Sequence, residues 1–100
     1  MIKHIVMWKF KDSAEGKTKK ENISIVKENL LKLPAIIDEI KFMSIHGDDS
    51  GSDDNFDAVL ITEFENFEDL HTYKVHPEHQ KVSQYVKLVS CSRASVDYNL

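Results

Sequence analysis

The first ten residues alternate between mostly apolar and mixed positions, as the two faces of a β-strand do. The mostly apolar set falls on one face and consists of Ile2, His4, Val6, Trp8 and Phe10. The other face places Ile5 and Met7 between two lysines. Apolar groups on both faces predict a strand that is covered from both sides.

The hydrophobic period changes to three and four residues between about Lys17 and Leu33, which predicts an amphipathic helix. Its apolar stripe consists of Ile23, Val26, Leu30 and Leu33. Pro34 disfavours helical backbone at the preceding residue, so this helix is expected to end near Leu33. The polar segment 11–16 before it is expected to be a loop.

The middle of the chain predicts two strands around one polar loop. Residues 36–45 and the stretch FDAVLITEF at 56–64 are the strand candidates, and HGDDSGSDDN between them is rich in turn residues. The aspartates suggest calcium, but the spacing from Asp48 or Asp49 does not match the EF-hand template. A solvated loop is therefore expected, and cation binding by residues 47–55 stays an open alternative.

The last third of the chain predicts a broken helix and then a fourth strand. Asn66 is a good N-cap for the helix, and Pro77 interrupts it. A further helical stretch is expected from about Glu78 to Leu88, and VSCSRASVDY at 89–98 is expected to be a strand. The buried side of the first helical part is expected to hold Phe67, Leu70 and Tyr73.

The resulting order β-α-β-β-α-β predicts an α+β, ferredoxin-like domain that spans residues 1–100. In this arrangement a four-stranded antiparallel sheet carries its helices on one face only. The opposite face, which includes Ile5 and Met7, then needs an apolar cover. The simplest cover is the same face of a second copy, so a homodimer is expected.

Composition narrows the partners and the compartment. The net charge of −4 argues against nucleic acid or an anionic membrane as a partner, because both need a basic surface. No apolar run approaches the roughly 20 residues that span a bilayer. Cys91 is the single cysteine, which fits a reducing compartment, so the cytoplasm is the expected location. Since no glycine-rich phosphate loop is present, no nucleotide or other cofactor is expected.

Three of the five histidines lie in the segment LHTYKVHPEHQKV at 70–82: His71, His76 and His79. Pro77 interrupts the helix that a zincin-type pair would need, and no other cluster of cysteines or histidines completes a set of four ligands. No metal is therefore expected, although a site formed by His76 and His79 stays open.

Acid–base chemistry is another use for the same segment. Tyr73 and His79 flank the helix break, and His4 lies among apolar neighbours, where desolvation should lower its pKa and keep it neutral. A neutral imidazole can remove a proton next to a carbonyl while a phenol donates to the developing enolate. Residue chemistry alone favours the plainer alternative, in which Tyr73 is a core residue and His79 caps a helix. Cys91 is expected to be a packed, inert thiol.

The segments MIKHIVMWKFKD, DAVLITEFENFEDLHTYKVHPEHQKV and SRASVDY resemble the stress-responsive dimeric α/β-barrel family, the Dabb domain, over essentially the whole chain. The most specific marks are the K-H-I-V opening and the Y-x-x-H-P-x-H segment. The resemblance implies a ferredoxin-like subunit whose sheet pairs with that of a second copy to form a closed barrel.

The resemblance implies more than one function. The leading expectation is a homodimeric stress-responsive A/B barrel protein with a small-molecule pocket, whose physiological role the resemblance does not define. One plant branch is a cofactor-free polyketide cyclase with a histidine base and an assisting tyrosine, and its positions match His79, Tyr73 and His4. A further tyrosine and histidine of that cyclase fall at Val26 and Ala58. The alternatives are therefore a cyclase, lyase or isomerase acting on a small carbonyl compound, and a non-catalytic small-ligand carrier.

Overall fold

The structure, a computed structural model, describes residues 1–100. Its strands are β1 (Ile2–Phe10), β2 (Ser13–Ala14), β3 (Lys17–Thr18), β4 (Phe42–Gly47), β5 (Ala58–Phe64) and β6 (Ser90–Asn99). Its helices are α1 (Lys19–Leu31), the short 3-10 helix η1 (Leu33–Ala35), α2 (Phe67–Val75) and α3 (Pro77–Val89). Four antiparallel strands form the main sheet in the order β4-β5-β1-β6, which confirms the predicted ferredoxin-like α+β fold.

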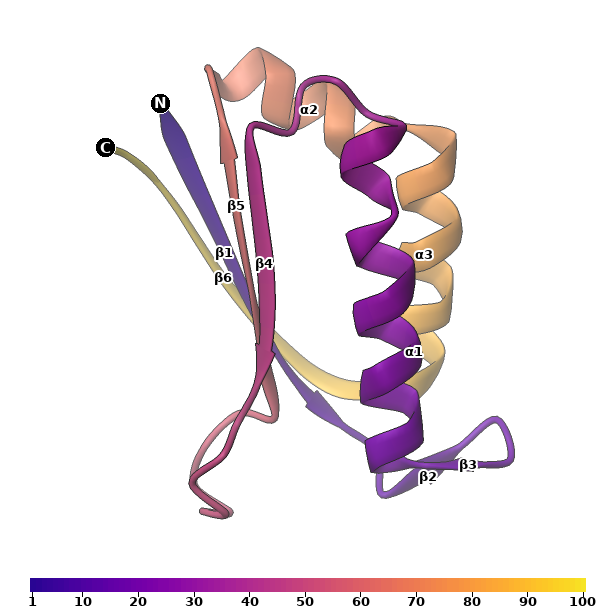
Figure 1. The fold of residues 1–100 in the computed structure, drawn as a ribbon. Helices are drawn as coiled ribbons and strands as arrows, with labels where there is room; N and C mark the ends of the chain where they lie inside the picture. Colours follow the sequence, from indigo (N-terminus) through magenta and orange to yellow (C-terminus); the bar gives the residue numbers. More distant parts are fainter.

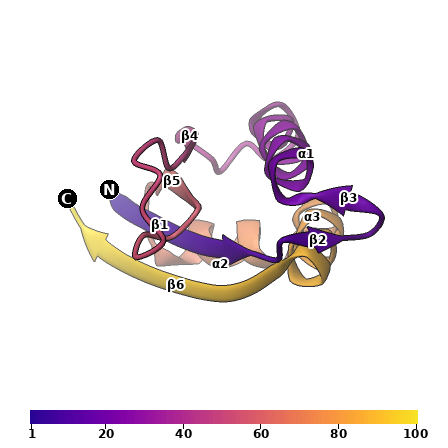
Figure 2. The same ribbon diagram turned by 90° about the horizontal axis from the view of Figure 1, so that it is seen from below.

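One face of the sheet is covered by helices. α1 and α3 pack against each other over this face, and α2 lies near one end of the sheet (Figure 1, Figure 2). The alternation predicted for β1 is confirmed, because its helix-facing side chains are all buried: Ile2, His4, Val6, Trp8 and Phe10. Leu60 and Phe64 from β5 and Val26 and Leu30 from α1 complete this side of the core. No helix is long and apolar enough to cross a membrane.

Local signals in the sequence fix where the helices begin. Thr18 and Glu21 form a capping box at the start of α1, in which each side chain accepts a backbone N–H of the other residue. Asn66 caps α2 by accepting the Asp69 N–H at 2.8 Å. His76 ends α2 and caps α3, since its Nδ1 accepts the Glu78 N–H at 3.1 Å. The break expected at Pro77 is thus a change from one helix to the next.

The strand predicted over 36–45 begins later than expected, at Phe42. The preceding residues continue in tight turns: the Ile37 N–H donates to the Leu33 carbonyl at 2.8 Å, and the Ile40 N–H donates to the Ile37 carbonyl at 3.2 Å. Ile37 and Ile40 are both buried, whereas Ile36 is 50% exposed. Their apolar pattern therefore reflects a three-residue turn period rather than strand alternation.

The loop predicted over 11–16 contains a small hairpin, β2–β3, in which Ser13 pairs with Thr18 and Ala14 pairs with Lys17. The two connecting residues, Glu15 and Gly16, have φ values of 53° and 72°. Two consecutive positive φ values are the requirement of the tightest hairpin turns. The sequence did not predict this turn, because Glu15 and not a glycine occupies the first of these positions.

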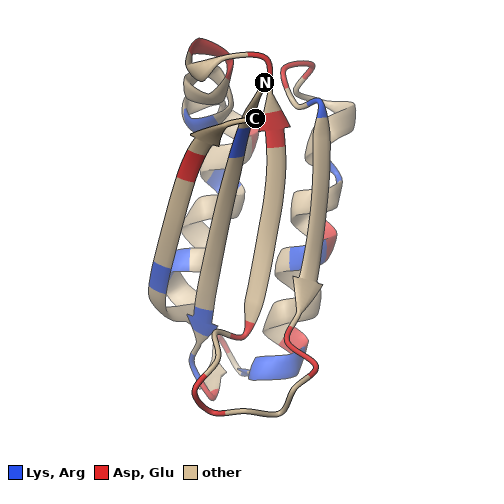
Figure 3. Ribbon diagram, turned by 90° about the vertical axis from the view of Figure 1, so that its left-hand side faces the viewer, with Lys and Arg blue, Asp and Glu red and all other residues tan.

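The other face of the sheet carries no helix (Figure 3). Pairing of β1 with β5 and β6 places Ile5 beside Ile61 and Val96, and Met7 beside Val59 and Ala94. Several large apolar side chains of this outer face are exposed: Met7, Phe42, Val96 and Tyr98. The prediction that β1 carries apolar groups on both faces is therefore confirmed, and the outer face is uncovered within a single chain.

Candidate functional site

A cavity of about 600 Å³ lies between the sheet and α3, and its lining includes all three residues that the sequence singles out. His4 enters from β1, Tyr73 from α2 and His79 from the first turn of α3. Its volume is within the range of small-molecule sites, about 300–1,000 Å³. The helix break at Pro77 places Tyr73 and His79 at one cavity.

Tyr73 is packed between aromatic rings and carries a hydroxyl without a hydrogen-bond partner. The residue is 1% exposed, and its ring lies 5.1 Å from the Phe64 ring and 4.3 Å from the His79 ring, measured between centroids. The hydroxyl is buried and has no hydrogen-bond partner in the protein. Burial raises the pKa of Tyr73 above its ordinary value, so the phenol stays protonated and remains a donor.

His79 is oriented by a backbone carbonyl. Its Nδ1 lies 3.0 Å from the carbonyl oxygen of Lys74, and because a carbonyl can only accept, Nδ1 carries the hydrogen. The neutral ring then has its lone pair on Nε2. Burial lowers the pKa of His79, although the bond to Lys74 opposes this effect, so the ring is neutral at pH 7. The plainer sequence-based alternative is confirmed in both parts: Tyr73 is a buried core residue, and His79 caps the C-terminal end of α2 by donating to the Lys74 carbonyl, while His76 caps the start of α3.

His4 forms a pair with a residue that sequence reasoning missed. Its Nδ1 contacts the carboxylate of Asp97, and the ring lies edge-on to Tyr73 with centroids 6.4 Å apart. Burial lowers the pKa of His4, and the Asp97 carboxylate opposes this effect. Asp97 also lies 3.9 Å from the Lys74 ammonium. The signal that could have identified Asp97 is strand register, because His4 and Asp97 are cross-strand partners of β1 and β6.

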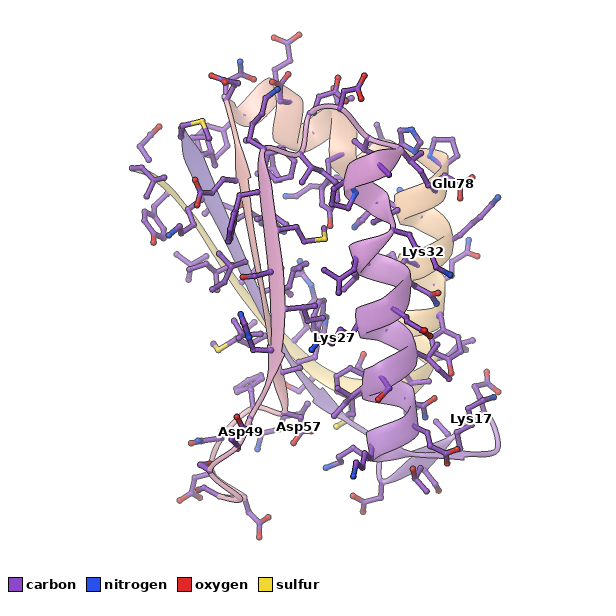
Figure 4. All side chains as sticks on the ribbon, viewed as in Figure 1. Lys17, Lys27, Lys32, Asp49, Asp57 and Glu78 are labelled. Carbon is purple, nitrogen blue, oxygen red and sulfur yellow. The ribbon has the colours of Figure 1, made fainter.

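His71 and the acidic loop lie outside the cavity. His71 is exposed, and no group of three or more His, Cys, Asp or Glu side chains is arranged to hold a metal ion. Hydrogen bonds from Ser50 and Asn55 lower the pKa of Asp48, so part of the loop is organised by its own side chains. Asp49 in this loop and Glu78 in the His-Pro segment lie at opposite ends of the molecule (Figure 4).

Three further lining residues carry positive charge, and sequence reasoning did not identify them: Lys74, Lys87 and Arg93. Cys91 also lines the cavity and is exposed, so the prediction of a packed thiol is wrong. The reason is that β6 is an edge strand, and most of its residues are exposed. A register shift between Lys9 and Phe10, which pair with Ser92 and Ser90, also leaves Cys91 as an extra residue in β6. Val26 and Ala58, the positions of the cyclase tyrosine and histidine, are buried core residues.

The comparisons place the chain among proteins of the same fold. The model of the stress-responsive A/B barrel domain family, Dabb, matches residues 2–100. A dimeric protein of unknown function with a ferredoxin-like fold from Bacteroides fragilis is 31% identical, with a TM-score of 0.87 over 99% of this chain and 95% of that chain. No match is found among curated proteins.

Two plant structures share the fold at lower identity. The At3g17210 protein from Arabidopsis thaliana is 20% identical, with a TM-score of 0.83 over 100% of this chain and 95% of that chain. A hydroxynitrile lyase from Passiflora edulis is 16% identical, with a TM-score of 0.82 over 97% of this chain and 90% of that chain. Identities this low establish a common fold alone.

Proposed function

The chain belongs to the stress-responsive A/B barrel domain family, and from that premise we propose that its cavity binds a small carbonyl compound and promotes proton transfer next to the carbonyl. His79 acts as the base and Tyr73 as the hydrogen-bond donor. The observation that carries the proposal is the Tyr73 hydroxyl, which is buried without a partner. An unsatisfied buried donor costs about 1–3 kcal/mol, and a ligand oxygen would remove that cost.

His79 and Tyr73 would supply the two parts of such a reaction. Nε2 of His79 accepts a proton from the carbon next to the carbonyl and the ring becomes an imidazolium. The electron pair left on that carbon moves into the bond to the carbonyl carbon, and the oxygen becomes an enolate. The Tyr73 phenol, protonated because of its burial, donates a hydrogen bond to that oxygen. The neutral state of His79 is the form that this step requires.

His4 and Asp97 support the same site from the sheet. The Asp97 carboxylate accepts from Nδ1 of His4 and so fixes the ring, as orienting partners do in many acid–base sites. The centroid of the His4 ring lies 6.4 Å from that of Tyr73, so His4 borders the space that the carbonyl would occupy. We assign His4 the role of a polar wall that contacts the ligand, with His79 as the base because its ring is the nearer to Tyr73.

The proposed working form is a cytoplasmic homodimer joined through the outer face of the sheet. The Bacteroides fragilis protein, 31% identical, is dimeric. The outer face presents Met7, Phe42, Val96 and Tyr98 to solvent, and a matching face of a second copy would bury them. The cytoplasmic assignment is supported by Cys91, the single cysteine, which has no second thiol to pair with in the chain.

The test is hydrogen–deuterium exchange at carbon. Benzylacetone is incubated with the protein in D₂O, and loss of the proton signals next to its carbonyl is followed by NMR. We expect exchange above the buffer rate, reduced about 10²-fold or more in His79→Ala and Tyr73→Phe, since these remove the base and the enolate donor. His71→Ala is the matched control, because His71 is an exposed histidine on α2 outside the cavity lining.

The outcomes separate the two functional classes. Binding without exchange above buffer would contradict the enzyme proposal and favour a non-catalytic carrier. Exchange that survives in His79→Ala would show that another group is the base.

A further inference from the structure

The cavity differs in charge from the molecule that contains it. The whole chain has a net charge of −4. Every lining side chain with a permanent charge is nevertheless cationic: Lys74, Lys87 and Arg93. No aspartate or glutamate lines the cavity. These cations favour a negatively charged ligand. An anion is attracted to the cavity, although the acidic remainder of the surface repels it.

Of these cations, Arg93 is the one best placed for a ligand. Its cross-strand partner is Trp8, whose side chain is buried on the helix-covered face, so Arg93 belongs to the cavity side of β6. Its guanidinium forms no salt bridge, and its one side-chain hydrogen bond is a long contact of 3.4 Å to the Ser95 hydroxyl. A guanidinium offers five N–H donors in a fork that matches a carboxylate, so most of its bonding capacity is free.

Lys74 and Lys87 are less well suited than Arg93 to bind an anionic ligand. Lys74 already has the Asp97 carboxylate 3.9 Å from its ammonium, which offsets its charge. Lys87 lies in the last turn of α3, near the start of β6, and has no carboxylate partner. The positive charge of Arg93 also acts on the pKa values of His4, Tyr73 and His79, so its guanidinium lies within electrostatic range of the proposed reacting groups.

We propose that the natural ligand is an organic acid with an apolar body, and that Arg93 binds its carboxylate with Lys87 as a second cation. This inference rests on the proposed function and specifies its substrate class: a keto acid in which an apolar segment separates the carboxylate from the reacting carbonyl. The lining fits each part. The carboxylate meets Arg93, the body meets side chains such as Val6, Val82 and Val86, and the carbonyl meets the unpartnered Tyr73 hydroxyl.

The test compares two ligands of the same shape and different charge. β-Benzoylpropionate carries a ketone and a carboxylate, and β-benzoylpropionamide replaces the carboxylate by a neutral amide. Trp8, the single tryptophan, lines the cavity, so its fluorescence reports binding of either compound. We expect the carboxylate to bind about tenfold more tightly than the amide, the ratio typical of a charged hydrogen bond. Added salt should reduce this preference.

Two variants test whether Arg93 causes the preference for the carboxylate. Arg93→Gln should remove most of the preference for the carboxylate and leave amide binding within about twofold; since Arg93 is exposed, the fold should tolerate the change. Lys27→Gln makes the same change in net charge at an exposed position on α1 outside the lining and should keep the full preference. Equal binding of acid and amide by the wild-type chain would overturn the inference and leave the proposed function standing.

Two other outcomes complete the test. A preference of undiminished size in Arg93→Gln would overturn the assignment of Arg93. Binding of neither compound would overturn the inference alone if benzylacetone still exchanges and loses that exchange in His79→Ala. Binding of neither compound together with no exchange of benzylacetone would overturn both the inference and the proposed function.

Discussion

The two faces of the sheet are incomplete in different ways. The helix-covered face is packed by α1 and α3, and its one buried side-chain atom without a partner is the Tyr73 hydroxyl. The outer face is satisfied in its polar groups but leaves Val96 62% exposed, together with other large apolar side chains. One ligand atom can satisfy the unpaired hydroxyl, whereas only another protein surface can cover the exposed apolar side chains. Strand alternation thus places the proposed ligand face and the proposed assembly face on opposite sides of the same strands.

The largest expected effect comes from a charge on the outer face. Ile61 lies near its centre, between Ile5 of β1 and Ser44 of β4. In Ile61→Asp, dimerisation would bury an unpaired carboxylate at a cost of several kcal/mol, so we expect the dimer dissociation constant to rise more than about 10³-fold. Analytical ultracentrifugation at micromolar concentration measures the change.

Ser24→Asp is the control for this substitution, because Ser24 is exposed on α1 and the change in charge is the same. We expect it to leave the dimer intact. A wild-type chain that sediments as a monomer, or an Ile61→Asp variant that stays dimeric, would contradict the assignment of the outer face to assembly.

A smaller effect of opposite sign is expected on the helix-covered face. In the ligand-free protein, Tyr73→Phe removes a buried hydroxyl without a partner and keeps the ring packed against Phe64. We therefore expect the free energy of unfolding to rise by about 1 kcal/mol, measured by urea denaturation. Tyr85→Phe is the matched control and should lower stability, because the Tyr85 hydroxyl donates to Asn22 at 2.6 Å. Destabilisation by Tyr73→Phe would indicate that its hydroxyl already has a partner.

The smallest effect is the response of stability to acid. Burial lowers the pKa of His4 and His79 below the ordinary value of 6.5, so just below that pH the unfolded chain binds more protons than the folded one. The contribution of these two histidines to the free energy of unfolding should be constant above about pH 6.5. Below that pH it should fall by at most about 1.4 kcal/mol per pH unit for each histidine. His79→Gln should reduce the slope between pH 6.5 and 5. Equal slopes in wild type and His79→Gln would contradict the desolvation of His79.

The fold was predictable where a single hydrophobic period or a single helix-breaking residue determines the local structure. Alternation along β1 and Pro77 between α2 and α3 both gave correct elements. The prediction failed at Ile37 and Ile40, because two isoleucines three residues apart fit a strand or a turn equally until the core is known. It also failed at Cys91, because a local apolar pattern does not show that the last strand lies at the exposed edge of the sheet.

The candidate site was predictable in part. Tyr73 and His79 lie six residues apart around a helix break, so local sequence indicates that they approach. His4 with Asp97, and Trp8 with Arg93, are separated by most of the chain and meet only through the pairing of the first and last strands. Sequence therefore identifies groups on one segment and misses partners that depend on strand register.

The central claim is that the Tyr73 hydroxyl receives the ligand carbonyl, and the infrared stretching frequency of that carbonyl tests it most directly. Benzylacetone labelled with carbon-13 at the carbonyl is bound to the wild-type protein and to Tyr73→Phe. A hydrogen bond from Tyr73 should lower the stretching frequency in the wild-type complex relative to the variant. Identical frequencies in the two complexes would contradict the account.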